Sequence, residues 1–217
     1  DGSLRSPKRV SDANPQIAEF LWGRRVLVDY VDERDNKLQA TLALPAGYEQ
    51  GKRYPMIVYF YEKYSQRHHE FSLPVYDDRP HMSTYASNGY LVLMPDIVYD
   101  VGYPGSSALD DVVAASKKAI ELGYADPERI GLQGHSWGGY ETSFILTQTD
   151  MFATIVTGAP LTNLTSMNNI LYKQSGNPNG PILQWSQGRM ADQPWDDPER
   201  WRSQSPIEHV AKISTPF

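Results

Sequence analysis

The pattern Gly134-x-Ser136-x-Gly138 is the part of the sequence best suited to chemistry, because it sets a serine between two small residues. An apolar run at 130–132 precedes it, and a helical pattern at 140–148 follows. This order predicts a buried strand, a tight turn with the serine at its apex, and a helix. The glycines allow strand and helix backbones to approach closely, while a strained conformation exposes the serine hydroxyl.

A serine in this setting can act as a nucleophile. The backbone N–H of Trp137 and the N-terminal end of the helix face any oxyanion that forms beside Ser136. The alternative is a chance match, since Gly-x-Ser-x-Gly is common when these five residues are taken alone. The preceding strand, the following helix and a third small residue, Gly139, favour a nucleophile elbow over chance.

Other apolar runs indicate the elements that must position this turn. Residues 26–32 and 38–44 are β-rich and flank the charged turn 33–37, which predicts an antiparallel hairpin. Strands and helices then alternate, with strands expected at 55–61, 90–94, 130–132 and 153–157, and helices at 82–87, 107–123 and 140–148. In the helix at 107–123, Ser107 is the expected N-cap, with Asp110 at capping-box spacing. The pattern predicts an α/β fold, with a mostly parallel sheet flanked by helices.

The ends of the chain are less regular than its middle. Residues 1–14 are polar and predict a lead-in or linker, which leaves 15–217 as one domain. Residues 161–205 are rich in Asn, Gln, Pro and Trp, and predict either a rim over the active site or surface loops. Within and after this segment, helices are expected near 163–172, 198–203 and 206–213, followed by the start of another buried strand at 214–217.

Composition excludes several classes of function. The net charge of −6 and the lack of a basic run argue against a general nucleic-acid binder. No run approaches 18 consecutive apolar residues, so no membrane span is predicted. The sequence contains no cysteine, which excludes disulfides, thiolate catalysis and cysteine-ligated metal. Because the first residue is Asp1, localisation stays open between the cytoplasm and a periplasmic or secreted location.

The sequence Gly-His-Ser-Trp-Gly-Gly-Tyr at 134–140 resembles the elbow of the prolyl oligopeptidase family, which includes dipeptidyl and acylaminoacyl peptidases. Gly-Tyr-Ala-Asp-Pro-Glu-Arg-Ile at 123–130 is similar to that family's approach to the elbow. Further similar segments lie at 42–45, 53–55, 205–207 and 213–216. The resemblance covers about residues 15–217. It implies an α/β-hydrolase fold and a serine peptidase that cleaves short peptides without a metal or cofactor.

The resemblance also implies roles for individual residues. Ser136 would be the acylated nucleophile, and the Tyr61 hydroxyl would join the N–H of Trp137 in binding the oxyanion. The glycine-rich loop common after this tyrosine is replaced here by Glu-Lys-Tyr-Ser, so Tyr59 and Tyr64 are alternatives to Tyr61. The indole of Trp137 would form one wall of the substrate pocket.

An apolar specificity pocket is implied after the sixth strand, where Leu161, Leu164 and Met167 follow one another at helical spacing. The same spacing suits the buried face of a helix. His135 directly precedes the nucleophile and is expected to point away from it. No carboxylates at helical spacing accompany His68, His69 and His81, so no metal site is predicted.

A complete catalytic triad is not predicted within the chain. In α/β-hydrolases the acid and the histidine follow the serine on later strands, whereas His209 is the sole histidine after Ser136. Asp192, Asp196 and Asp197 lie in the irregular segment and do not pair with it in the expected order. We therefore expect an incomplete catalytic domain that is truncated before its last strands and lacks the triad Asp and His. The N-terminal part that is also expected to be missing is commonly a β-propeller in this family. The alternatives are a carboxylesterase on the same fold and a non-catalytic domain.

Overall fold

One mixed sheet of six strands forms the centre of the computed structural model, which describes residues 8–70 and 81–217. The strands are β1 (Arg24–Val31), β2 (Lys37–Leu44), β3 (Tyr54–Tyr59), β4 (Leu91–Pro95), β5 (Ala125–His135) and β6 (Thr154–Gly158). Their order across the sheet is β1-β2-β4-β3-β5-β6. The β1–β2 hairpin and the β2–β4 pair are antiparallel, and the remaining pairs are parallel. The predicted hairpin and mostly parallel sheet are confirmed.

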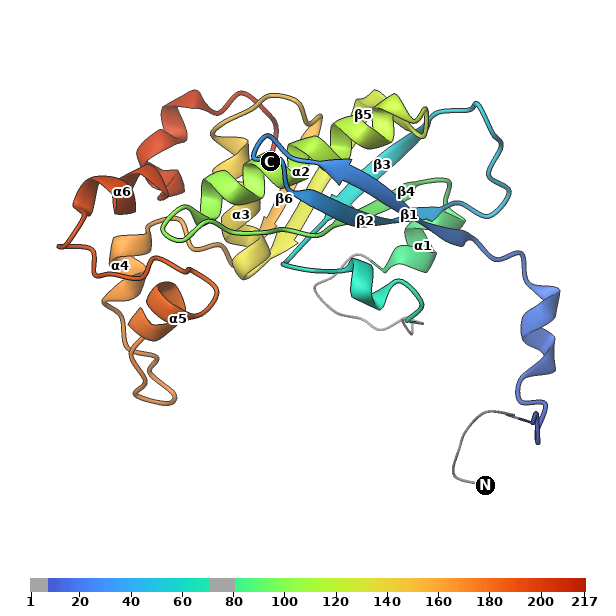
Figure 1. Cartoon of the computed structure of the whole chain (residues 1–217), viewed down its shortest axis with the longest axis horizontal. Coiled ribbons are helices and arrows are strands. Elements are labelled where there is room, and N and C mark those ends of the chain that lie inside the picture. Colours follow the sequence, from blue (N-terminus) through green and yellow to red (C-terminus); the bar gives the residue numbers. More distant parts are fainter. Residues whose placement is uncertain (1–7, 71–80) are drawn as a thin grey trace.

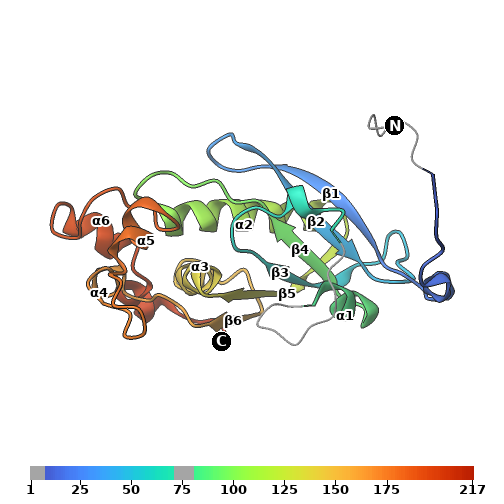
Figure 2. The ribbon, with the colours of Figure 1, turned by 90° about the horizontal axis from the view of Figure 1, so that it is seen from below.

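Helices lie on both faces of this sheet. The α-helices are α1 (Met82–Ser87), α2 (Pro104–Glu121), α3 (Trp137–Leu146), α4 (Leu164–Asn168), α5 (Gly180–Trp185) and α6 (Pro198–Ser203), and the 3-10 helices are η1 (Pro15–Glu19), η2 (Ser65–Arg67) and η3 (Pro206–Lys212). Figure 2 shows α2 and α1 on opposite sides of β3 and β4. In Figure 1, α4, α5 and α6 gather at one end of the molecule, and η1 projects from the other.

The main core lies between the sheet and the pair α2 and α3. Central strands contribute Met56, Leu93 and Ile130, and each is at most 1% exposed. Helix α2 faces them with Ala108, Val112, Ala115 and Ala119, all fully buried. Small and β-branched residues at this spacing let the helix lie close to the strands. A smaller cluster on the other face joins α1 to β2 and β4 through Met82, Ala43 and Val92.

The predicted start of α2 is wrong by three residues. The helix begins at Pro104, a residue type suited to the first helical turn because it has no N–H to leave unpaired. Ser107 lies inside the helix and not at its N-cap. Its hydroxyl donates to the carbonyl of Tyr103 at 2.8 Å and accepts from the N–H of Asp100 at 3.0 Å. A serine four residues after a carbonyl can bond back to it, and the sequence pattern does not distinguish this from a cap.

The segments after β6 also differ in part from the expectation. Helix α4 ends at Asn168, short of the predicted 172, and α5 was not predicted. Helix α6 is confirmed, whereas the predicted helix at 206–213 is of the 3-10 type. The expected strand at 214–217 is not formed among the described residues. Its backbone nevertheless lies beside β6, where the N–H of Ile155 donates to the carbonyl of Pro216 at 3.0 Å.

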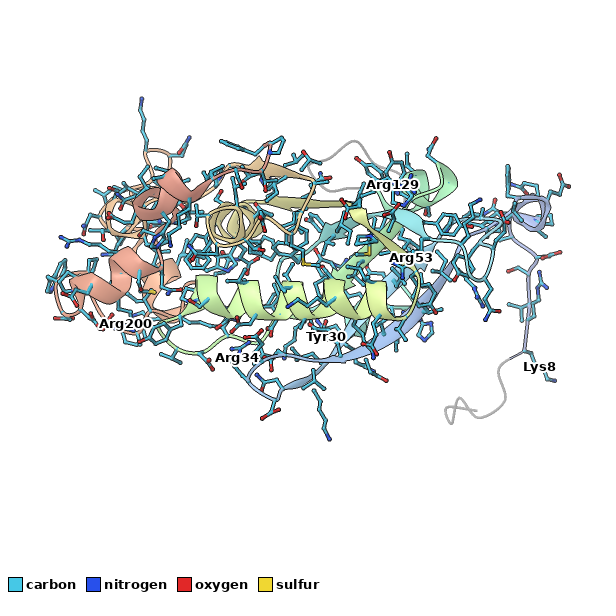
Figure 3. All side chains as sticks on the ribbon, turned by 90° about the horizontal axis from the view of Figure 1, so that it is seen from above. Lys8, Tyr30, Arg34, Arg53, Arg129 and Arg200 are labelled. Carbon is cyan, nitrogen blue, oxygen red and sulfur yellow. The ribbon has the colours of Figure 1, made fainter. Side chains whose placement is uncertain are left out.

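A buried ion cluster ties the hairpin turn to α2, and Figure 3 shows its arginine, Arg34, beside this helix. The Arg34 guanidinium lies 2.8 Å from an oxygen of Asp111 and 2.9 Å from one of Asp32. Both carboxyl side chains are fully buried. Asp111 also accepts from the N–H of Val98 at 2.7 Å. The turn that the sequence presents as merely charged is therefore anchored inside the protein.

Transmembrane helices are not found in the described part of the chain, where each helix is too short or too polar to cross a bilayer. Residues 8–14, the described part of the predicted lead-in, form neither helix nor strand.

The ion cluster predicts a pH-dependent stability. Burial raises the pKa of the Asp111 carboxyl from 3.8 to about 7, so the folded protein holds a proton that the unfolded chain releases between pH 4 and 7. The stabilisation linked to this proton is complete below pH 4 and falls as the pH rises to about 7. The fall is at most about 4 kcal/mol, because the pKa of Asp111 is raised by about three units and each unit corresponds to about 1.4 kcal/mol. Urea unfolding of wild type and Asp111→Asn from pH 4 to 8 measures it. An equal slope in both proteins would contradict the assignment.

Candidate active site

Ser136 sits at the turn between β5 and α3 in a conformation that non-glycine residues rarely adopt, with φ 57° and ψ −113°. Its N–H donates to the carbonyl of Gly158 at the end of β6, at 2.9 Å. Its carbonyl accepts from the N–H of Tyr140 at 3.0 Å. These bonds hold the serine on both sides, so the surrounding strands maintain a backbone conformation that is unfavourable on its own. The predicted strand, tight turn and helix are confirmed.

Glycines make this turn possible because backbone atoms occupy the space of their missing side chains. A Cβ at Gly134 would lie 2.2 Å from the carbonyl oxygen of Gly138. One at Gly138 would lie 2.6 Å from the carbonyl oxygen of Phe60, and one at Gly139 would lie 2.3 Å from that of Gly158. The elbow therefore touches the ends of β3 and β6 directly, backbone against backbone.

The space beside Ser136 contains donors suited to an oxyanion. The first N–H groups of a helix have no partner within that helix, and Trp137 begins α3 immediately after the serine. The approach of Gly138 to Phe60 also brings the next residue, Tyr61, to the elbow: its ring carbon Cδ2 lies 3.8 Å from the Cβ position of Gly138. Tyr61 lies two residues beyond the end of β3, not on the strand itself as predicted.

The three candidate tyrosines lie in two different environments. Tyr61 packs in one cluster with Trp137, and its hydroxyl accepts a hydrogen bond of 2.6 Å from Nε2 of Gln187. Tyr59 and Tyr64 pack against each other, with ring centroids 5.8 Å apart, in the cluster that contains α1. Of the three, Tyr61 is the one that the fold brings to the elbow, and its oxyanion role remains a prediction.

The predicted pocket residues lie in the same cluster as Tyr61 and Trp137. Trp137 is 1% exposed and its ring lies 4.5 Å from that of Tyr140, while Leu164 is fully buried. Leu161 and Met167 are half-buried. The structure therefore gathers these side chains beside the elbow, but of the four only Leu161 and Met167 are partly exposed. The Trp137 side chain is covered in this conformation.

A buried acid, Glu141, was missed by sequence reasoning. It lies on α3, is fully buried, and its carboxyl group is hydrogen-bonded to the Tyr99 hydroxyl. Burial raises the pKa of Glu141 well above its usual value, so that its neutral form is favoured. The one signal in the sequence was an acidic residue within an otherwise apolar helical pattern, and the pattern does not say which way that residue points.

The sole histidine after Ser136 in the sequence and the histidine directly before it have contacts of their own. His209 lies near Ser203, with 2.9 Å between Nε2 and the Ser203 carbonyl, and its ring is 6.2 Å from that of Phe144. Phe144 is eight residues along α3 from Ser136, which at 1.5 Å per residue is about 12 Å. The ring of His135 lies against Gly158 of β6.

The acids of the irregular segment have structural partners. Asp197 is the N-cap of α6 and accepts from the N–H of Arg200 at 3.1 Å, and Asp192 pairs with the Arg200 guanidinium and accepts from the Trp201 indole. Asp196 accepts from the N–H of Gln193 at 3.0 Å. None of these carboxylates bonds to His209. Across residues 8–70 and 81–217 no group of three or more His, Asp or Glu side chains is arranged so that it could hold a metal ion.

The sequence is similar to a known protein family and to individual members of the curated proteins. The sequence model of the prolyl oligopeptidase family matches residues 101–217, more than half of the chain. The acylamino-acid-releasing enzyme of Arabidopsis thaliana is 32% identical over 124 residues, which is 53% of this chain and 15% of that protein. An uncharacterised peptidase of Bacillus subtilis, YuxL, is 28% identical over 114 residues, 52% of this chain and 16% of that protein.

Solved structures share the fold. Pyrococcus horikoshii acylaminoacyl peptidase superposes with a TM-score of 0.71 at 20% identity, over 96% of this chain and 33% of that chain. Dipeptidyl peptidase 4 of Porphyromonas gingivalis gives 0.67 at 17% identity, over 95% of this chain and 29% of that chain. The predicted α/β-hydrolase fold is confirmed, and the chain spans about a third or less of the length of the proteins it matches.

The glycine contacts at the elbow predict the effect of adding one methyl group. Gly138→Ala should lower the free energy of unfolding by about 1–3 kcal/mol, because its Cβ would press on the carbonyl of Phe60. Gly131→Ala on β5 is the matched control, since its Cβ would meet Thr154 at 3.4 Å, an ordinary contact. Urea unfolding compares the two variants. Equal losses would show that the close approach to β3 is not the limiting contact.

Proposed function

This chain belongs to the prolyl oligopeptidase family, and we propose that it carries the nucleophile and the oxyanion site of a serine peptidase that cleaves short peptides. The observation that carries the proposal is the elbow, where a strained Ser136 adjoins the free N-terminal end of α3 and the ring of Tyr61. These are the parts that acyl transfer requires from a protein: a nucleophile and fixed donors for the developing charge.

The reaction follows from these positions. Oγ of Ser136 attacks the peptide carbonyl carbon, and the carbonyl oxygen becomes an oxyanion that accepts hydrogen bonds from the N–H of Trp137 and the hydroxyl of Tyr61. The C–N bond then breaks, the amine leaves with a proton, and an acyl group remains on Ser136. Water attacks this ester and releases the acid. Leu161 and Met167 supply the apolar surface against which a substrate side chain would lie.

A serine hydroxyl is a weak nucleophile until a base accepts its proton. The engagement of His209 with Ser203, and of the nearby aspartates with Arg200 and Gln193, supports a base and an acid supplied by residues outside these 217. The share of each relative that the chain matches, between 15% and 33%, is consistent with this. We propose that the whole protein adds the triad Asp and His and an N-terminal β-propeller.

Covalent labelling tests the nucleophile and the source of the base together. The full-length protein should react stoichiometrically with a fluorophosphonate probe at Ser136, and Ser136→Ala should remove both labelling and turnover while leaving the fold intact. The 217-residue chain should label poorly, because no base activates its serine. Mass spectrometry of the labelled peptide measures both. Rapid labelling of the short chain would assign the base to His209, and turnover retained by Ser136→Ala would exclude this nucleophile.

The oxyanion role of Tyr61 makes a separate prediction for the full-length protein. Tyr61→Phe should lower kcat by roughly 10²–10³, the usual loss for one such donor, with little change in KM, because the charge develops only in the transition state. Tyr64→Phe is the matched control on the other face of the sheet. The hydrolysis rates of aminoacyl arylamides and of short acyl esters measure this effect. In the wild-type protein, a preference for the arylamides indicates a peptidase, and a preference for the esters indicates an esterase. A loss in Tyr64→Phe alone would move the role to that residue.

A further inference from the structure

The hydroxyl of Tyr61 is held by a residue far away in the sequence. Nε2 of Gln187 donates to the phenol oxygen of Tyr61 at 2.6 Å, across 126 residues of chain. Both side chains are half-buried. A bond of this length between groups that share little water is well placed to fix the orientation of the phenol.

The turn that carries Gln187 is itself rigidly tied to α5. The N–H of Gly188 donates to the carbonyl of Ile182 at 3.0 Å, and the N–H of Met190 donates to that of Leu183 at 2.9 Å. A Cβ at Gly188 would lie 2.3 Å from the carbonyl oxygen of Leu183, so this turn requires glycine. The chain therefore folds back tightly on α5 and presents the residues on either side of Gly188 toward Tyr61 and its neighbour.

A second contact holds the same part of the chain. Arg189 pairs with Glu62, the residue after Tyr61, and its guanidinium lies 4.4 Å from the centroid of the Tyr99 ring. The Tyr99 hydroxyl lies 3.1 Å from the carbonyl oxygen of Tyr61. The carbonyl of Arg189 accepts from the N–H of Gly102 at 2.8 Å. Tyr61 is thus held at its hydroxyl by Gln187, at its carbonyl by Tyr99, and through the pairing of Glu62 with Arg189. Packing of the ring alone would not require these polar contacts.

We propose that Gln187 is a positioning residue that orients the Tyr61 hydroxyl toward the oxyanion, an inference that rests on the proposed function. A tyrosine hydroxyl has one proton to donate and can accept at its oxygen. Because the Gln187 amide fills an acceptor position, the Tyr61 proton stays free for the substrate oxygen. Donation into the phenol oxygen also polarises its O–H bond and strengthens the bond that it donates.

Variants that remove or reverse the donor at Gln187 distinguish a positioning role of this residue from a role in packing alone. In the full-length protein Gln187→Ala should lower kcat roughly 10-fold to 100-fold, the range for a misplaced catalytic group, with KM little changed. Gln187→Glu keeps the size of the side chain but places a carboxylate that accepts the Tyr61 proton, so kcat should fall further and recover as pH falls and the carboxylate is protonated. A merely structural role would make Gln187→Glu the milder change at every pH.

A double-mutant cycle with Tyr61→Phe gives the decisive measurement. If Gln187 acts through the Tyr61 hydroxyl, Gln187→Ala should cause no further loss of kcat in the Tyr61→Phe background. Gln193→Ala is the matched control, because Gln193 bonds to Gln184 in the same segment and should leave kcat unchanged. If Gln187→Ala fails to fold, Gln187→Met replaces it, being similar in length and lacking a donor.

Each outcome has one reading. Additive losses in the double variant, or an unchanged kcat in Gln187→Ala, would overturn the positioning role while the proposed function stands. Loss of kcat in Gln193→Ala as well would also overturn it, since general loosening of the segment would then explain the effect. Turnover retained by Ser136→Ala would instead refute the proposed function itself.

Discussion

The close contact of backbone segments around Ser136 is the constraint on which the rest of the structure depends. No side chain fits where Gly134 faces Gly138, or where Gly139 faces Gly158, because a Cβ there would overlap a backbone carbonyl oxygen. The backbones of β5, α3 and β6 are therefore in direct contact. The strained serine persists because these surroundings determine its backbone on every side. The same contacts bring the ends of β3 and β6 against the elbow, and with β3 the ring of Tyr61.

The irregular segment after β6 packs against the elbow and is not merely surface. It contributes the half-buried Leu161 and Met167 beside Trp137, and it returns through α5 to place Gln187 on the Tyr61 hydroxyl. Its acids are used in capping and in pairing with Arg200, which keeps the segment in one arrangement. Apolar side chains beside Trp137 and a donor to Tyr61 thus come from one segment, and the hydrogen bonds within that segment hold both in place.

Buried polar groups connect the layers of the molecule. Arg34 joins the hairpin to α2 through Asp111, and Tyr99 joins α3 to the end of β3 through Glu141 and the carbonyl of Tyr61. Unpaired, each of these groups would be costly to bury, whereas paired they specify which elements lie together. Neither connection follows from hydrophobic periodicity, since that pattern identifies which face of an element is buried and is silent about partners across the core.

The sequence by itself determined most of the elements up to β6 and the position of the elbow, because both depend on local patterns. Strand and helix periodicity, the Gly-x-Ser136-x-Gly spacing and the hairpin depend on residues within a few positions of one another. The predictions fail mainly after β6, where α5 was not predicted and the strand expected at 214–217 is not formed among the described residues. Tertiary structure alone decided which tyrosine meets the elbow, that Trp137 and Leu164 are covered, and that Gln187 reaches Tyr61. These are contacts between residues far apart in the chain, fixed by how the layers pack, and a single sequence carries no local signal for them.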